Sequence, residues 1–412
     1  MNSKVKFTKI GAGKESFTFR SCTVQINIAN KNIMIYNILC FVKFMSKMEN
    51  IMKERIKYID ATKGIGMLMI MLGHITVYDN PVDTWMSSFK VSLFYIISGF
   101  LMSYSGSVKG RNFKNFLSKL LNSLALPYLM FSIIGIIFKT ACVLLKHQPM
   151  TEVFSVFWEY LMDCIFLKGI NSMWFIPSLF IGEIVFFWIV RSPKVIKIIY
   201  GIFGVFAITL TNMLTGFTEN TITAVSLSWI KEDVIRLINA TGKSLCAAWF
   251  IGAGYIIYIF YKKITEKNIK LALGSILSLI NIVLSQINLD VDINSLKEGT
   301  HTYLFYICGI IGTLGAIMIL DYLSSYINMD LINYLGKNSL IIMCTHTVLG
   351  MRSVAYSGWS YVAYMPDTGN LEYIFKCLIV LIILIFIECG IITFINRYCP
   401  FLIGKSKIIT KE

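Results

Sequence analysis

A lysine and a histidine share one apolar stretch of the chain. Lys63 and His74 lie in the segment RIKYIDATKGIGMLMIMLGHITVY, residues 55–78, with ten residues between them. In an α-helix their Cα atoms would be roughly 16 Å apart along the axis and only about 20° apart around it. Both side chains therefore fall on one face of the helix, at different depths in a membrane. Asp60, one turn before Lys63, can pair with the lysine.

These residue types suit an acyl transfer. Histidine changes charge near neutral pH and can take the proton of an attacking hydroxyl. A cation about 16 Å away on the same face can bind an anionic part of an extended second substrate. Together they describe transfer from a long thioester such as acetyl-CoA, whose phosphates would stay in the cytoplasm. Because charged residues inside spanning helices usually face a cavity, we expect Lys63 and His74 to line one continuous channel.

The composition predicts a membrane protein. Of the 412 residues, 56% are hydrophobic and only 15% are charged, whereas soluble globular proteins have about a quarter of their residues charged. Apolar runs of about 20 residues recur along the chain. We therefore expect an all-α, polytopic integral membrane protein with about ten transmembrane helices, near residues 57–77, 86–104, 122–146, 172–191, 196–214, 243–261, 269–288, 301–322, 333–352 and 372–396.

Two stretches fall outside these spans. Residues 1–47 are more polar, and we expect an N-terminal extension that is poorly ordered or precedes the true start methionine. Residues 48–412 would then form one ten-helix domain. The stretch 153–167 carries two acidic residues within an apolar pattern, which is typical of an amphipathic helix lying at the membrane interface.

The net charge of +15 reflects orientation rather than nucleic-acid binding. Lysine and arginine gather in alternate loops between the apolar runs, which is the positive-inside pattern. This predicts an inner (plasma) membrane protein with both termini in the cytoplasm. The ten cysteines form no CxxC pair and no cluster with histidine. We therefore expect no disulfide, no metal and no permanently bound cofactor.

Other polar residues in the predicted spans are candidates for the site, with His346 and Glu183 as further catalytic candidates beside His74. His346 falls at a depth similar to that of His74, Glu183 sits midway in the fourth span, and Arg352 closes the outer end of the ninth. Each has a structural alternative. A histidine can simply bond a neighbouring helix, Glu183 can be a packing or pore-lining acid, and Trp174 can anchor an aromatic belt instead of contacting substrate.

Five segments resemble one family. YIDATKGIGMLMIMLGH, SLFYIISGFL, FKNFLSKLLNSLALPY, SMWFIPSLFIGE and YLGKNSLIIMCTH stand in the order found in the bacterial polytopic O-acyltransferases, acyltransferase family three. The resemblance runs from about residue 55 to residue 400. Within the family, the chain most resembles the fucose 4-O-acetylase-like members, which acetylate sugar hydroxyls on surface glycans.

The resemblance implies roles for single residues. His74 would be the catalytic base, Lys63 would contact the acyl-CoA with Asp60 beside it, and Ser98 and Gly99 would shape the channel. The basic segment before the third helix would bind CoA phosphates through Arg111, Lys114 and Lys119. Apart from the resemblance, Trp174 and Arg352 are assigned to the substrate channel from their places at helix ends. The chain departs from the family at two positions: Lys63 replaces the more frequent arginine, which loses bidentate phosphate binding, and Asn122 stands where a basic residue is common.

The expected function is transfer of an acetyl (acyl) group from cytoplasmic acyl-CoA to a sugar hydroxyl of a surface polysaccharide or lipid-linked glycan. Direct attack by the hydroxyl and a covalent acyl-histidine relay both remain open. The alternative is a transporter or flippase for a lipid-linked sugar, although the sequence shows no corresponding broken helices in its two halves. A non-catalytic membrane partner of an assembly complex, the third possibility, would not need Lys63 or His74.

Overall fold

The computed structural model divides the chain into two units, residues 1–55 and 56–412. It describes residues 56–76, 80–106, 108, 112–222, 228–362 and 371–405, all in the second unit. The N-terminal extension predicted over residues 1–47 lies outside the described residues, as does the basic residue Arg111. All described helices and strands belong to this second unit.

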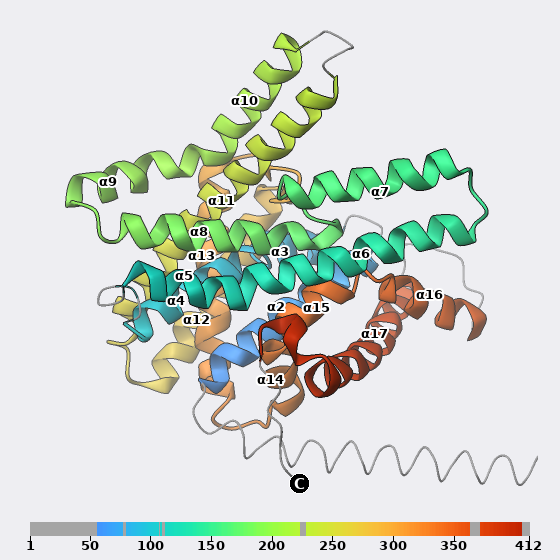
Figure 1. Ribbon diagram of the computed structural model, residues 1–412. Coiled ribbons are helices and arrows are strands. Elements are labelled where there is room, and N and C mark those ends of the chain that lie inside the picture. Colours follow the sequence, from blue (N-terminus) through green and yellow to red (C-terminus); the bar gives the residue numbers. More distant parts are fainter. Residues whose placement is uncertain are drawn as a thin grey trace, which may run out of the picture. The chain divides into compact units, whose positions relative to one another are not determined.

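The second unit is built from helices, with one two-stranded hairpin (Figure 1). The α-helices are α2 (Lys57–Ile75), α3 (Pro81–Ser87), α4 (Ser92–Tyr104), α5 (Phe113–Leu120), α6 (Leu126–Leu145), α7 (Met150–Ile165), α8 (Phe175–Ile189), α9 (Lys194–Phe203), α10 (Ala207–Thr221), α11 (Ser228–Tyr261), α12 (Lys267–Ile287), α13 (Thr302–Leu323), α14 (Asp330–Lys337), α15 (Ser339–Thr345), α16 (Met351–Val362) and α17 (Leu371–Tyr398). The antiparallel strands are β1 (Val291–Asp292) and β2 (Lys297–Glu298).

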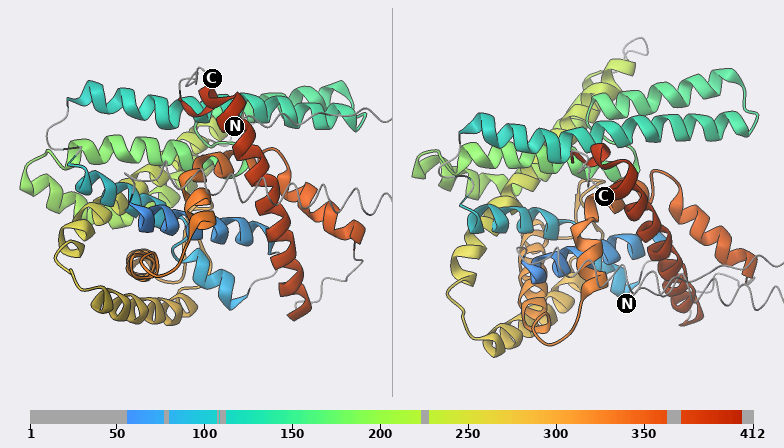
Figure 2. Two further views of the ribbon diagram at one scale, coloured as in Figure 1. Left: turned by 90° about the horizontal axis from the view of Figure 1, so that it is seen from below. Right: turned by 60° about the horizontal axis from the view of Figure 1, so that its bottom comes forward.

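Eight helical stretches among the described residues are long and apolar enough to cross a membrane. They correspond to eight of the ten predicted segments; 57–77 and 333–352 are the other two. The prediction of an all-α polytopic membrane protein is confirmed. The predicted stretch 153–167 is the helix α7, which runs beside α6 in every view (Figures 1 and 2), and its place at the interface stays a prediction.

Helix α2, which carries Lys63 and His74, lies among many other helices. It packs against α3, α4, α13, α14, α15 and α17. Its 19 residues give a length of about 28 Å, close to the roughly 30 Å of a bilayer's hydrocarbon core. The polar residues in the middle of α2 would therefore lie deep within the membrane. The neighbouring helices surround them there.

The predicted ninth helix, 333–352, is wrong as a continuous element. α14 ends at Lys337, α15 begins at Ser339, and α16 begins only at Met351. Asn338, between α14 and α15, donates its side-chain amide to the carbonyl of Tyr334 at 2.9 Å. Asparagine competes for backbone groups in this way and favours turns over helix interiors. The break leaves α15 as a seven-residue helix.

Two more predicted segments have different bounds. The segment 196–214 is divided by a short 3-10 turn, η3 (Gly204–Phe206), into α9 and α10. The segment 122–146 is the end of a longer helical stretch that includes α5 and a π-helical turn, η1 (Leu121–Ala125). Single π-turns of this kind are frequent at functional sites.

Glycines bring α4 and α11 into backbone contact. A Cβ on Gly99 would lie 1.8 Å from the carbonyl oxygen of Ile251, and one on Gly254 would lie 2.0 Å from the carbonyl oxygen of Ile96. The two contacts are reciprocal, as expected for helices that cross at small residues. A Cβ on Gly182 of α8 would meet Ala247 of α11 at 3.0 Å. α4, α11 and α8 therefore form one closely packed group.

The variant Gly99→Ala is expected to lower the thermal midpoint in detergent. The added methyl overlaps a backbone oxygen, which cannot move aside as a side chain could, and overpacking of this kind costs about 1–3 kcal/mol. Gly216→Ala on α10 is the matched control, because nothing lies within 4 Å of its Cβ position. It should leave the midpoint unchanged or raise it, since alanine favours a helix over glycine by about 1 kcal/mol. Equal midpoints for both variants would contradict the close approach.

Candidate active site

The predicted site residues fall around two cavities. The first, here called the Lys63 cavity, holds about 300 Å³ and is lined by Lys63, Phe94, Ile97, Ser98, Leu101, Met102, Ser105, Phe116, Lys119, Leu120, Leu124, Phe175, Leu179, Glu183, Ser339, Leu340 and Met343. The second, the His74 cavity, holds about 900 Å³ and is lined by Ile70, Gly73, His74, Asp83, Thr84, Ser87, Lys90, Val91, Lys139, Asn171, Ser172, Trp174, Phe175, Leu289, Asp290, Val291, Asp292, Ile293, Asn294, Met343, Thr347, Gly350, Arg352 and Ser353.

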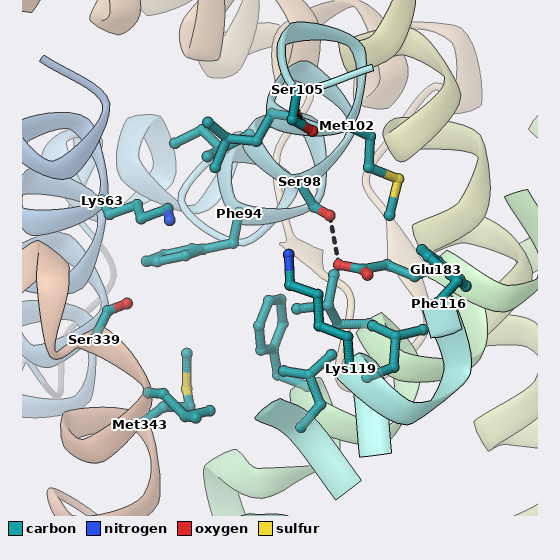
Figure 3. A pocket seen from close by; sticks show the side chains of 17 residues that line it. Lys63, Phe94, Ser98, Met102, Ser105, Phe116, Lys119, Glu183, Ser339 and Met343 are labelled. Atoms are coloured by element: carbon teal, nitrogen blue, oxygen red, sulfur yellow. Dashed lines mark hydrogen bonds between the residues drawn. The ribbon is translucent and has the colours of Figure 1, made fainter. Parts of the chain in front are cut away.

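The Lys63 cavity combines apolar walls with two cationic side chains. Lys63 reaches it from α2 and Lys119 from α5, and both ammonium groups point into the space (Figure 3). On its far side Ser98 of α4 donates to Glu183 Oε1 of α8 at 2.5 Å. The remaining wall is mostly Leu, Ile, Phe and Met. Such a site can hold a chain with an anionic end against the lysines and an apolar portion along the wall.

Glu183 therefore lies in the Lys63 cavity and not beside His74. The sequence placed both among the catalytic candidates, but the lining of the His74 cavity does not include Glu183. Its carboxylate accepts the Ser98 hydroxyl and faces the same space as Lys63 and Lys119. The geometry suits a residue that offsets cationic charge and orients a donor substrate.

The His74 cavity begins where α2 ends. His74 lies in the last turn of this helix, and Arg352 of α16 donates from Nη1 to the His74 carbonyl oxygen at 2.7 Å. Positive side chains at a helix C-terminus complement its free carbonyls and dipole. The Arg352 contact thus fixes the position of His74 without using the imidazole.

A second imidazole lies directly behind the first. The His346 ring centroid is 5.2 Å from that of His74. His346 is fully buried, its Nδ1 lies 2.5 Å from the carbonyl oxygen of Ile342, and it is absent from the lining of both cavities. Its neighbour Thr345 donates to Glu388 of α17 at 2.6 Å. Of the two histidines, only His74 lines a cavity, and His346 lies buried next to it.

The lining of the His74 cavity also includes polar groups and an indole. Trp174 is 8% exposed, and Lys243 Nζ lies 4.9 Å from the centroid of its indole. Lys243 also donates to Asn294 Oδ1 at 3.0 Å, in the turn between β1 and β2. Trp174 is thus part of a cavity wall, which decides against the alternative of an aromatic belt anchor. Apolar and aromatic surface with a few placed polar groups is usual in small-molecule sites.

The loop before Trp174 is held by buried charge. Asp163, at the end of α7, bonds Arg236 Nε of α11 at 2.9 Å and Lys168 at 3.1 Å. Between Asp163 and Trp174 the backbone has positive φ at Leu167 (61°), Gly169 (73°) and Asn171 (50°). Non-glycine residues with positive φ persist where surrounding contacts determine the conformation. The ion pairs supply such contacts and so fix this wall of the His74 cavity.

Several predicted binding residues do not reach either cavity. Gly99 was expected to shape the channel, but it packs against α11 instead. It follows Ser98 by one residue, which turns it about 100° around the helix and away from the cavity. Lys114 is exposed on α5, and Asp60 is buried; neither belongs to the two linings. The role expected of Arg111 concerns a residue outside the described part.

The single channel expected between Lys63 and His74 is also wrong. Lys63 opens on one cavity and His74 on another, and no residue of α2 lines both. The two linings share Phe175 of α8 and Met343 of α15. These two side chains, which come from parts of the sequence far from α2, form a partition between the cavities.

Sequence reasoning missed most of the polar wall of the His74 cavity. Asp83, Lys90, Asp290 and Asp292 lie in its lining, with Lys90 and Asp83 paired at 3.5 Å. The available signal was the dense acidic and amide content of NLDVDINS, residues 288–295, in a loop between two spans. The described residues contain no group of three or more histidine, cysteine or acidic side chains arranged for a metal; the expectation of a metal-free site stays a prediction.

Comparison with known proteins gives one match. The family described as an acyltransferase domain matches residues 56–395. The matched stretch contains both cavities and every site residue predicted above. The comparison with curated proteins found no match.

Proposed function

We propose, from the premise that this chain belongs to acyltransferase family three, that it transfers an acetyl or similarly short acyl group from acyl-CoA to a sugar hydroxyl. The observation that carries the proposal is the pair of cavities along α2, with a cation at the first and an imidazole at the second. A two-substrate transfer needs a place for each substrate, and the two spaces differ in the way that a CoA thioester and a glycan differ.

In this proposal the donor occupies the Lys63 cavity. The ammonium groups of Lys63 and Lys119 bind phosphate oxygens or the polar pantetheine end, as compact point charges. The apolar wall takes the acyl chain, and Ser98 and Glu183 orient the amide-containing arm. CoA would arrive from the cytoplasmic side, with the chain's termini on that side and the protein in the inner membrane.

The acceptor occupies the His74 cavity. Its Asp83, Asp290 and Asp292 carboxylates and the Trp174 indole supply the hydrogen bonds and the stacking face that sugars use. At about 900 Å³ the space is three times the volume of the donor cavity, which suits one or more sugar rings. A surface polysaccharide or a lipid-linked glycan would present its hydroxyl there.

The reaction balances with these groups alone. The sugar oxygen forms the new C–O bond to the thioester carbonyl carbon, the C–S bond breaks, and the CoA thiolate leaves. The His74 imidazole takes the hydroxyl proton in the attack and returns it to the thiolate, so that free CoA and an acetyl ester are the products. A relay through an acyl-histidine would use the same residue in two successive transfers.

The test is a thioester assay on the purified full chain in lipid nanodiscs. We expect acetyl-CoA to release free thiol when a mixture of methyl glycosides is added, with a matching acetyl mass increase on a glycoside. Nuclear magnetic resonance of surface glycans from cells with and without the protein should show acetyl signals that depend on it. Movement of sugar across the membrane without thiol release would contradict the proposal and favour a transporter.

A further inference from the structure

The partition between the two cavities lies on the route of the acyl group. Resting on the function proposed above, the thioester carbonyl bound in the Lys63 cavity has to meet a hydroxyl held beside His74. Phe175 and Met343 are the two residues that line both spaces. Any acyl group has to pass between their side chains, so the gap that they leave limits its size.

The Phe175 side of the partition is fixed. Its ring stacks on Tyr95 with centroids 4.9 Å apart and planes inclined by 21°. Tyr95 is fully buried, and its hydroxyl lies 2.6 Å from Ser178 Oγ, one turn further along α8. A second ring, Phe94, meets Phe175 edge-on at 5.8 Å. An aromatic side chain held by two rings in this way cannot turn without losing both contacts.

The side chain of Met343, on the other side of the partition, can change its conformation. Its main-chain carbonyl accepts a hydrogen bond from Ser172 at 2.8 Å, so the backbone is placed, but methionine has three rotatable side-chain bonds and no branching. Its side chain reaches the space between Lys63, Ser339 and Phe94 (Figure 3). The position of the thioether therefore decides how wide the passage is.

We propose that Met343 determines which acyl group the protein transfers, with Phe175 as the fixed side of the same passage. The native pair admits an acetyl group and rejects longer linear acyl chains, because the thioether fills the space that the additional carbons would need. Removing the three terminal heavy atoms of Met343 would admit propionyl and butyryl groups. Met343 is a specificity-determining residue and takes no part in proton transfer.

The experiment measures kcat/KM of Met343→Ala for acetyl-, propionyl- and butyryl-CoA with the methyl glycoside mixture. One methylene in an apolar site changes discrimination about 10- to 200-fold. We expect the ratio of butyryl to acetyl transfer to rise at least about tenfold over the native ratio. Met343→Phe should act in the opposite direction and lower the rate with acetyl-CoA as well.

Met318→Ala is the matched control. Met318 of α13 is also a buried methionine but lines neither cavity, so the same atoms are removed without changing the donor site or the partition. Its butyryl-to-acetyl ratio should stay at the native value. Met343→Val provides the same direction of change with less lost volume if the alanine variant does not reach the membrane.

The outcomes separate the two proposals. Thiol release from acetyl-CoA by the native chain, with equal ratios for the native, Met343→Ala and Met343→Val proteins, overturns the role of Met343 and leaves the acyltransferase proposal standing. A rise for Met318→Ala as large as that for Met343→Ala overturns it too. A native chain that releases no thiol from any of the three thioesters overturns the proposed function and this inference with it.

Discussion

Replacing His74 with glutamine should lower the rate of acyl transfer by about 10²- to 10⁴-fold, the contribution usual for a positioned general base. Glutamine keeps a polar side chain of similar length but cannot accept and return a proton. The hydrogen bond from Arg352 to residue 74 uses the main-chain carbonyl and survives the change. Binding of acetyl-CoA, measured by calorimetry on the purified protein, should remain at the native level because the donor cavity does not include His74.

Two companion variants make that result interpretable. His301→Gln changes an exposed histidine that lines neither cavity, and it should keep native activity. His346→Gln removes the ring behind His74 and should lower activity less than His74→Gln does. If His74→Gln transferred acetyl at the native rate, or if His346→Gln lost more activity than His74→Gln, His74 would not be the base.

The second large effect is expected at Lys63. Lys63→Met removes the cation and keeps an unbranched apolar side chain. The variant loses a charge-assisted hydrogen bond to acetyl-CoA, which contributes about 1.5–3 kcal/mol. We therefore expect a higher KM for acetyl-CoA. This corresponds to about a 10- to 150-fold increase, since about 1.4 kcal/mol is tenfold. The change should be in KM more than in kcat, because the lysine lies in the donor cavity and the imidazole in the other.

Two further substitutions separate the effect of the charge at residue 63 from the effect of its position in the donor cavity. Lys63→Arg keeps the positive charge and should retain most of the affinity. Lys114→Met removes an exposed lysine of α5 that lies outside both linings, so KM should not change. A native KM for Lys63→Met, measured at low ionic strength where exposed charges are least screened, would remove Lys63 from the donor site.

The sequence predicted the central helix well. The spacing of Lys63 and His74 depends only on helical geometry, which a continuous apolar run of about 20 residues reliably adopts. Both side chains do face cavities. Likewise Trp174 and Arg352 were assigned to the channel from their places at helix ends and both line the His74 cavity.

The predictions that were wrong depend mostly on contacts between segments that are distant in the sequence. The partition arises because Phe175 of α8 and Met343 of α15 line both cavities, and no local pattern encodes that meeting. Gly99 was assigned to the channel with Ser98 although adjacent helical residues point in different directions. The break at Asn338 had a local signal, the polar run Gly336–Lys337–Asn338–Ser339, which the length of the apolar stretch outweighed.

The backbone contact between α4 and α11 has a consequence for membrane lipids. Because a single methyl group does not fit between Gly99 and Ile251, the much wider hydrocarbon tail of a lipid cannot slip between these two helices. The space between α4 and α11 is therefore closed to anything that travels within the plane of the bilayer. Under the proposed function, an acceptor carried on a lipid tail would reach the His74 cavity by a route that does not pass between these two helices.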